Sequence, residues 1–248
     1  MNICAILVSV LLLFLAFAEA ETVIHLNAIG HRDFRYAKKV LPNVYQQDLE
    51  RDFYCDCSYS GKEIDLKSCG YVPRKQIVRA KRLEWEHIVP AWVLGHQRAC
   101  WQKKINGKLG GRRNCTHNDP IFARAEGDLI NLVPSIGEIN GDRQNFRYSI
   151  WSSNPTPIYG QCQTIIDFKN KRIQPRKEIR GRIARIQFYM AEQYGIRLTR
   201  EDKRIFCAWA REYPVDSWEF ERDKRIQKIQ GNSNHYVTEA LATGKVCD

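Results

Sequence analysis

The stretch Arg82-Leu83-Glu84-Trp85-Glu86-His87-Ile88-Val89, followed by Pro90, gives the first structural prediction for this chain. Leu83, Trp85 and His87 alternate with Glu84, Glu86 and Ile88 along it. A period of two residues is typical of a β-strand, and proline ends such a strand because it cannot donate to the ladder. We therefore predict a strand over residues 82–89.

The same stretch holds the densest group of reactive side chains. The carboxylate of Glu86 is a hard oxygen ligand of the kind Mg²⁺ prefers, and the neighbouring His87 imidazole can act as a general base near neutral pH. Adjacent strand residues point to opposite faces, so one site for both would require a bend or a bulge. Most histidines are structural, so Glu-His alone indicates catalysis only weakly.

Elements outward from this strand follow from local composition. We expect a helix over Phe34–Asp52, kinked near Pro42, and a loop over Lys103–Asp119, which is rich in Gly, Asn and basic residues. A further helix is expected to start near Pro134 and to run to about Ile150. Two short strands are expected within Thr164–Pro175.

The last third of the chain is predicted to be helical. An apolar stripe at helical spacing consists of Ile179, Ile183, Ile186, Tyr189 and Met190, with Arg180, Arg182 and Arg185 off that face. Thr199 with Asp202 predicts a capped helix that ends before Pro214. Asp216 predicts the start of another, and Gly231 its end. Helices with a few scattered strands favour a single α+β domain, mostly helical.

The N-terminus and the cysteines indicate export. Residues 3–17 are almost wholly apolar and precede Ala18-Glu19-Ala20, which predicts a signal peptide over residues 1–20 and a mature domain over residues 21–248 without a membrane span. The mature chain has an even set of cysteines: Cys55, Cys57, Cys69, Cys100, Cys115, Cys162, Cys207 and Cys247. Disulfides are favoured over zinc, because Cys55-x-Cys57 is tighter than a usual ligand pair. The pairing is left open.

The charge balance points to a polyanionic partner. The chain has 39 Lys and Arg against 28 Asp and Glu, a net charge of +11. An excess of this size disfavours an acidic-surface cytosolic enzyme and suits contacts to nucleic-acid phosphates that do not depend on base sequence. The alternative is that the charge serves solubility alone.

Several contiguous motifs together resemble one protein family. They are Glu86-His87, Gly110-Gly111-Arg112-Arg113-Asn114-Cys115, Asn131-Leu132-Val133-Pro134 and Asn140-Gly141-Asp142-Arg143, with further stretches over nearly the whole mature chain. This pattern resembles the bacterial endonuclease I family of secreted and periplasmic nucleases. The wider relationship is to nucleases built on a ββα-metal finger, in which a strand histidine faces a metal ligand from the helix.

The resemblance implies a role for each matching position. His87 is implied as the general base and Arg112 as the contact to the scissile phosphate, while Glu86 and Asn140 would hold a single Mg²⁺, with Mn²⁺ or Ca²⁺ able to replace it in binding. The implied reaction is hydrolysis of DNA to 5′-phosphate ends, and RNA as a second substrate is left open. We also expect cleavage to be sequence-nonspecific, because nothing in the chain resembles a base-reading module, and the protein to be a monomer. Glu126 is a candidate to orient His87 through its backbone carbonyl.

Alternatives exist for both the residues and the function. Asn140 could instead cap or interrupt its helix, and Arg113 could replace Arg112. Glu84 is expected to form a salt bridge, and its alternative role is to support the metal ligands from the strand face it shares with Glu86. The rival functions are a metal-independent secreted ribonuclease and a non-catalytic, cationic polyanion-binding protein. Phe220 stands where relatives usually carry a cysteine, and Cys207 lies earlier in the chain, which leaves the C-terminal disulfide in doubt.

Overall fold

The computed structural model describes residues 33–151, 156–239 and 242–247. The predicted signal peptide, residues 1–20, lies outside the described residues. The α-helices are α2 (Phe34–Val44), α3 (Ile77–Ala80), α4 (Ala91–Gly95), α5 (Ala99–Gln102), α6 (Gly111–Asn118), α7 (Pro120–Gly127), α8 (Gly137–Arg143), α9 (Arg180–Tyr194), α10 (Arg200–Glu212), α11 (Ser217–Gln230), α12 (His235–Thr238) and α13 (Ala242–Cys247). Short 3₁₀ turns are η1 (Gln47–Leu49), η2 (Leu66–Cys69), η3 (Leu129–Asn131) and η4 (Lys177–Ile179).

The strands form small separate sheets. They are β1 (Tyr59–Ser60), β2 (Glu63–Ile64), β3 (Leu83–His87), β4 (Lys104–Ile105), β5 (Lys108–Leu109), β6 (Leu132–Ile136), β7 (Arg147–Tyr148), β8 (Ile165–Asp167) and β9 (Arg172–Gln174). The two-stranded sheets are β1–β2, β3–β6 and β4–β5, and a three-stranded sheet has the order β7–β9–β8. Helices with such sheets confirm the α+β class, and both strands predicted within residues 164–175 are present as β8 and β9.

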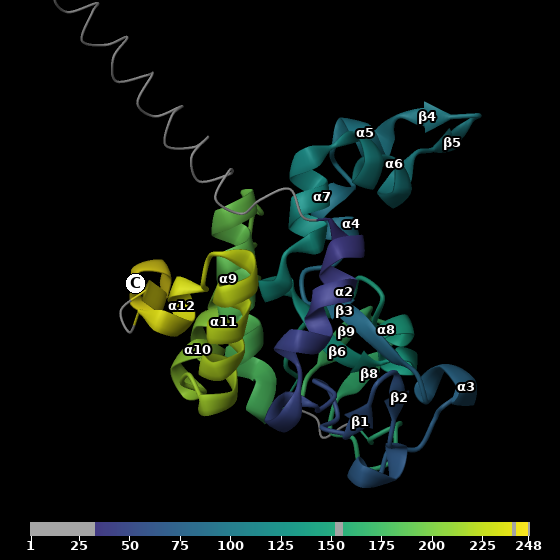
Figure 1. Ribbon diagram of the computed structural model, residues 1–248, viewed down its shortest axis with the longest axis vertical. Coiled ribbons are helices and arrows are strands. Elements are labelled where there is room, and N and C mark those ends of the chain that lie inside the picture. The colour runs from purple at the N-terminus through teal and green to yellow at the C-terminus, as the bar shows by residue number, and fades with distance from the viewer. Residues whose placement is uncertain (1–32, 152–155, 240–241, 248) are drawn as a thin grey trace, which may run out of the picture.

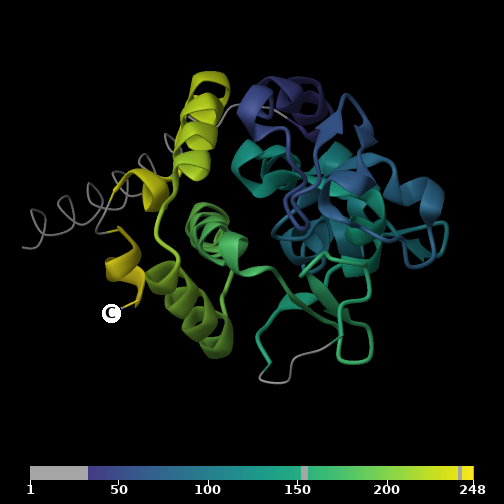
Figure 2. The same ribbon diagram turned by 90° about the horizontal axis from the view of Figure 1, so that it is seen from below.

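The centre of the molecule is the antiparallel pair of β3 and β6, which runs from Leu83 opposite Ile136 to His87 opposite Leu132. Helix α8 follows β6 directly and contacts both strands. The order strand, strand, helix therefore places the Glu86-His87 strand beside the helix that holds Asn140. The C-terminal helices α9 to α12 lie along one side of the molecule, away from β1, β2 and α3 (Figures 1 and 2).

The predicted helices of the last third are confirmed. Thr199 and Asp202 form a reciprocal capping box at α10, Asp216 caps α11, and Gly231 ends α11 in a left-handed conformation (φ 92°). Lying off the apolar stripe does not make these arginines exposed: Arg185 is 2% exposed and forms a buried ion pair with Glu219 at 2.6 Å. Arg185 of α9 contacts Glu219 of α11 and the backbone carbonyl of Tyr213 after α10, and a charge buried in this way requires a partner.

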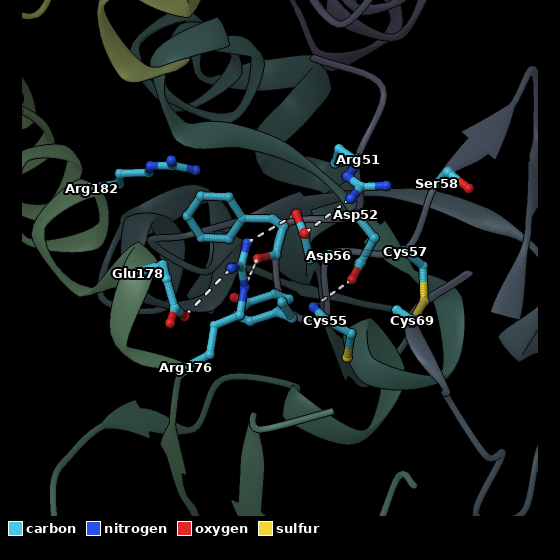
Figure 3. Close-up of polar contacts among 12 residues, drawn as sticks. Arg51, Asp52, Cys55, Asp56, Cys57, Ser58, Cys69, Arg176, Glu178 and Arg182 are labelled. Carbon is cyan, nitrogen blue, oxygen red and sulfur yellow. Dashed lines mark hydrogen bonds and ion pairs between the residues drawn. A yellow bond between two sulfur atoms is a disulfide. The ribbon is translucent and has the colours of Figure 1, made fainter. Parts of the chain in front are cut away.

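Four disulfides cross-link the chain, as the even cysteine count predicted. The pairs are Cys55–Cys162, Cys57–Cys69, Cys100–Cys115 and Cys207–Cys247. The last pair answers the question raised by Phe220, because Cys207 bonds to Cys247 and Phe220 is 53% exposed. Figure 3 shows the surroundings of Cys55 and Cys57, where Arg176 donates to the backbone carbonyl of Phe53.

The prediction of a loop over Lys103–Asp119 was wrong. Strands β4 and β5 form a hairpin whose turn residues, Asn106 (φ 50°) and Gly107 (φ 76°), both have positive φ, and helix α6 follows it. Asn-Gly is the pair that a two-residue hairpin turn of this kind favours. Composition hid the turn signal, because the same Gly and Asn content is typical of irregular loops.

Two helix boundaries were also wrong. The expected helix from Pro134 to Ile150 is instead strand β6, helix α8 and strand β7, because Pro134 pairs with Trp85 across the sheet and Gln144 (φ 51°) ends α8. The expected helix over residues 34–52 is shorter, and Pro42 lies inside its last turn. Gln47 (φ 59°) has a conformation that an α-helix cannot continue through.

No helix among the described residues is both long and apolar enough to cross a lipid bilayer.

Candidate active site

One cleft of about 940 Å³ brings together the residues that the sequence singled out. Glu86 and His87 of β3, Arg112 of α6 and Asn140 of α8 all line it. The remaining lining side chains include Phe34 and Lys38 of α2, Arg79 of α3, Trp92 of α4, Trp101 of α5 and Arg143 of α8. Residues far apart in the sequence therefore meet along strand β3.

The backbone does not need a bulge to bring Glu86 and His87 into one cleft. The pairing of β3 with β6 is regular through His87, yet the cleft is lined both by Leu83, Trp85 and His87 and by Glu84 and Glu86. These two sets belong to opposite faces of the strand. Because β3 pairs with β6 in a two-stranded sheet, its other edge borders the cleft, and side chains from both faces reach it.

The His87 ring is fixed by two neighbours. Its Nε2 lies 2.8 Å from the backbone carbonyl oxygen of Glu126, and its centroid lies 4.7 Å from the ring of Phe34. A carbonyl can only accept, so Nε2 carries the proton and Nδ1 is left as the basic nitrogen. This contact is the one through which Glu126 was expected to orient His87.

The electrostatics keep His87 neutral. Burial, followed by the positive charge of Arg112, lowers the pKa of the His87 imidazole to about 3. The ring is 6% exposed, so an imidazolium there would lose most of its hydration. A neutral imidazole at physiological pH is the form that can accept a proton.

Arg112 is held by the side chain of Glu126. The Arg112 Nε donates to Glu126 Oε1, and Thr116 Oγ1 donates to Oε2 at 2.8 Å. The guanidinium carbon lies 5.2 Å from the centre of the Phe34 ring, and 45% of the Arg112 side chain remains exposed. Glu126 thus contacts His87 through its backbone and Arg112 through its carboxylate.

Glu86 is paired with an arginine that the sequence analysis did not select. Arg143 Nη1 donates to Glu86 Oε1 at 2.8 Å and to the His87 carbonyl at 2.7 Å, and its Nη2 donates to the Ile88 carbonyl at 2.7 Å. Burial raises the pKa of the Glu86 carboxyl to about 7, although Arg143 opposes this shift. Arg143 is 1% exposed and joins α8 to the end of β3.

Asn140 is oriented by Glu84. Its Nδ2 donates to Glu84 Oε2 at 2.9 Å, and Glu84 also accepts from Arg79 at 2.8 Å and from Arg82 at 2.5 Å. Glu84 thus forms the expected salt bridges. The contact occupies the nitrogen of the Asn140 amide and leaves its oxygen available to a ligand.

Two glycines make this arrangement of α8 possible. A Cβ added at Gly137 would lie 2.5 Å from the backbone oxygen of Arg79, and one added at Gly141 would lie 2.0 Å from the Arg79 guanidinium. Because these two residues have no Cβ, Arg79 can cross closely over α8 and reach Glu84.

The donor atoms fit a hard divalent cation that keeps several waters. Arg143 contacts Oε1 of Glu86, and Glu84 holds the amide nitrogen of Asn140, so a carboxylate oxygen and an amide oxygen can face the cleft. Within residues 33–151, 156–239 and 242–247, no group of three or more His, Cys, Asp or Glu could hold a metal. Two oxygen donors are few for Zn²⁺ but acceptable for Mg²⁺, which commonly retains water and takes substrate phosphate as a ligand.

His96 and Arg98 have contacts within the protein. His96 stacks on Trp92 with ring centroids 3.7 Å apart, and Arg98 forms an ion pair with Asp119 at 2.6 Å. Arg143 was missed because an arginine in a helix gives no sequence signal of burial. Its position three residues after Asn140, on nearly the same helix face, was the available hint.

Comparison with known proteins identifies the family. The family model described as Endonuclease I matches residues 25–241. The chain belongs to the endonuclease I family. This endonuclease I chain is 49% identical over 220 residues to an extracellular deoxyribonuclease of Aeromonas hydrophila, covering 85% of this chain and 92% of the relative.

Two further relatives of the endonuclease I chain are similar over most of their length. A periplasmic deoxyribonuclease of Aeromonas hydrophila is 49% identical over 217 residues, covering 86% of this chain and 88% of the relative. An endonuclease-1 of Buchnera aphidicola is 45% identical over 212 residues, covering 84% and 83% of the two chains.

Proposed function

We propose that this protein is an exported, Mg²⁺-dependent endonuclease that hydrolyses DNA without sequence specificity and leaves 5′-phosphate ends, with RNA as a second substrate to be tested. The activity on DNA and the export are supported by the relatives, which are named extracellular and periplasmic deoxyribonucleases. The observation that carries the chemistry is the meeting of His87, Arg112, Glu86 and Asn140 in one cleft.

His87 is proposed as the general base. The Glu126 carbonyl accepts from Nε2–H, so Nδ1 can take a proton from a water molecule as that water attacks phosphorus. The lowered pKa keeps the base unprotonated in the free enzyme. The fixed ring is positioned before substrate arrives, which reduces the entropic cost of orienting it during the reaction.

Arg112 is proposed to bind the scissile phosphate. A guanidinium is always charged, and its fork of N–H donors suits a pair of phosphate oxygens. Glu126 holds Nε of Arg112, which leaves the Nη groups free to point toward substrate. The 45% exposed side chain is consistent with a group that waits for an anion.

Glu86 and Asn140 are proposed to hold the metal ion. When bound, Mg²⁺ would stabilise the negative charge that grows on the phosphoryl and leaving oxygens. Arg143 keeps the Glu86 carboxylate in place, and Glu84 turns the Asn140 amide so that its oxygen faces outward. In the ββα-metal-finger proposal, β3 carries the base and α8 carries the second ligand.

The test is cleavage of plasmid DNA by the pure mature protein with Mg²⁺ and with EDTA. We expect nicking only with the metal, and a loss of at least ~10²-fold in rate for His87→Ala because the general base is removed. DNA binding by His87→Ala should persist, because phosphate contacts lie mainly elsewhere. Equal cutting in EDTA would remove the metal mechanism.

The same assay separates the rival functions. A metal-independent ribonuclease would cut RNA in EDTA and leave DNA intact. A cationic binding protein would bind both polymers and cut neither. Single-stranded DNA, double-stranded DNA and RNA, each titrated with Mg²⁺ and Ca²⁺, complete the substrate profile.

A further inference from the structure

The hairpin of β4 and β5 is an exposed, basic element. Residues 97–118 contain six Lys and Arg and no Asp or Glu, and the hairpin occupies their centre. It projects from α5 and α6 away from the rest of the molecule (Figure 1). Every residue from Lys103 to Leu109 is exposed, so the fold itself gains little from these side chains.

The position of the hairpin relates it to the cleft. Trp101 precedes it and Arg112 follows it, and both line the cleft. The Cys100–Cys115 disulfide closes the base of this segment, and Gly110 N donates to the Lys103 carbonyl at 2.7 Å. A substrate strand held at Arg112 must therefore pass near the base of the hairpin.

The lysines of the hairpin have no acidic partners. Lys103, Lys104, Lys108 and the adjacent Arg113 form no ion pair with a carboxylate of the described residues, whereas the nearby Arg98 and Arg112 each do. Their charges are thus fully available to an external polyanion. A cluster of unneutralised cations beside a phosphate-cleaving cleft is complementary to a nucleic-acid backbone.

Two apolar side chains accompany these charges. Ile105 is 45% exposed and Leu109 is 56% exposed. The register pairs Lys104 with Leu109 and Ile105 with Lys108, so each face of the ribbon carries one lysine beside one apolar side chain. Ile105 and Leu109 also line a groove of about 430 Å³ with Arg113 and His117 of α6.

We propose that the β4–β5 hairpin is a second DNA-binding element, which holds the duplex beside the scissile phosphate. This inference rests on the proposed nuclease function. Lys103, Lys104 and Lys108 neutralise phosphates of the DNA backbone. Ile105 and Leu109 pack against sugars and base edges in a groove of the DNA. A hairpin of this length reaches roughly 10 Å, or about three base pairs, beyond α5 and α6. Apolar side chains in a groove are a known way to grip DNA without reading its sequence.

The first experiment measures binding in the absence of cleavage. The full mature chain carrying His87→Ala is titrated in EDTA against a labelled duplex of about 30 base pairs at several NaCl concentrations. The added substitutions Lys103→Ala, Lys104→Ala and Lys108→Ala should lower the slope of log Kd against log[NaCl] by about 2 to 3, since each lost phosphate contact removes ~0.9. We expect Kd to rise by roughly tenfold or more near 0.1 M NaCl.

A matched control removes the same charge elsewhere. Lys203→Ala, Lys224→Ala and Lys228→Ala change three exposed lysines on α10 and α11, on the other side of the molecule. This triple variant should change the slope by less than about 1. Equal effects of both triple variants would show that only net charge matters and would overturn the proposal.

The apolar contact has its own readout. Ile105→Ser with Leu109→Ser should raise Kd at least about threefold while leaving the salt slope unchanged, because no charge is altered. An unchanged Kd would overturn this part of the proposal. The hairpin lysine variant is also tested on phosphatidylserine vesicles. If this variant lost vesicle binding but retained duplex binding, the hairpin would be assigned to a membrane surface instead.

Failure of this inference can be told apart from failure of the proposed function. Protein without the His87→Ala substitution is assayed on plasmid DNA with Mg²⁺ alongside the binding series. Absence of cutting would reject the nuclease. Cutting by the parent protein, with equal KM in the hairpin lysine variant, would reject the hairpin alone.

Discussion

At the scale of single residues, Glu126 connects the two groups that are proposed to act on substrate. Its backbone oxygen accepts from His87, and its carboxylate accepts from Arg112 and Thr116. Backbone and side chain can be separated experimentally, because a substitution removes the carboxylate and keeps the carbonyl. Glu126 is 2% exposed, so its carboxylate is suited to hold a neighbour in a defined position.

Glu126→Gln should lower kcat/KM for DNA by about tenfold, because Arg112 loses a charged partner that fixes its orientation. The pH dependence of the rate should keep its shape, since the carbonyl contact to His87 remains. Thr116→Val is the matched control: it removes the hydroxyl contacts to the Glu126 carboxylate and to the Arg112 carbonyl, leaves the Glu126 charge in place, and should cost less than about threefold. A larger loss in Thr116→Val than in Glu126→Gln would contradict this assignment.

Asp52 predicts a pH dependence of stability. Its carboxylate accepts from the backbone N–H groups of Ile136 at 2.7 Å and of Cys55 at 2.6 Å, and the second contact is drawn in Figure 3. Burial nevertheless raises the pKa of the Asp52 carboxyl to about 6. The folded protein therefore binds this proton more tightly than the unfolded chain, whose Asp pKa is about 3.9.

The raised pKa adds to the free energy of unfolding. This contribution is fully present below pH ~4 and is lost as the pH rises through about 6. Asp52→Asn removes this dependence but also loses an acceptor for a backbone N–H, so the variant should be less stable throughout. Its deficit in the free energy of unfolding should shrink by about 2 kcal/mol between pH 4 and pH 7. Urea titrations at both pH values measure the free energy of unfolding of the parent protein and the variant. A deficit that grew with pH would contradict the prediction.

At the scale of elements, the disulfide at the base of the hairpin links stability to the site. Cys100 and Cys115 are 15 residues apart, and Arg112 lies within the closed loop. Replacing both by serine should lower the free energy of unfolding by about 3 kcal/mol on the chain-entropy account. The double substitution should also lower the activity of the still-folded protein, because α6, which carries Arg112, is no longer tied to α5.

Cys207→Ser with Cys247→Ser is the matched control for this element. That bridge joins residues 40 apart at the C-terminus, and its loss should cost about 4 kcal/mol on the same account. Activity of the still-folded protein should change little, because none of the described residues between Cys207 and Cys247 lines the cleft, whereas Arg112 lies between Cys100 and Cys115. Assays well below each variant's Tm compare the two, and equal loss of activity in both variants would contradict a special role for the hairpin base.

At the scale of the whole molecule, the net charge of +11 predicts salt-sensitive and sequence-independent binding. The affinity of the His87→Ala protein for duplex DNA in EDTA should fall by about 10³-fold or more between 50 and 200 mM salt. Duplexes of different base composition should differ by less than about threefold, because phosphate contacts carry no sequence information. Strong discrimination between such duplexes, at matched salt, would indicate base contacts.

The sequence selected residues that the fold brings together, although several elements that carry them were predicted wrongly. His87, Glu86, Arg112 and Asn140 were selected from the sequence, and all four line one cleft. Their surroundings were only partly foreseen, because burial depends on what packs from elsewhere. Arg143 is a helical arginine by sequence and a buried partner of Glu86 by structure.

The sequence by itself determined the α+β class, the capped C-terminal helices, the β3 strand and the use of eight cysteines in disulfides. These features depend on local periodicity, capping residues and counting, which act over a few neighbouring positions. Only the tertiary structure decided that Pro134 lies in a strand opposite Trp85 and that the basic loop is a hairpin followed by a helix. Local propensity does not favour one structure over another at these positions. Contacts between residues far apart in the chain, together with the disulfide from Cys100 to Cys115, stabilise the observed strands and helix.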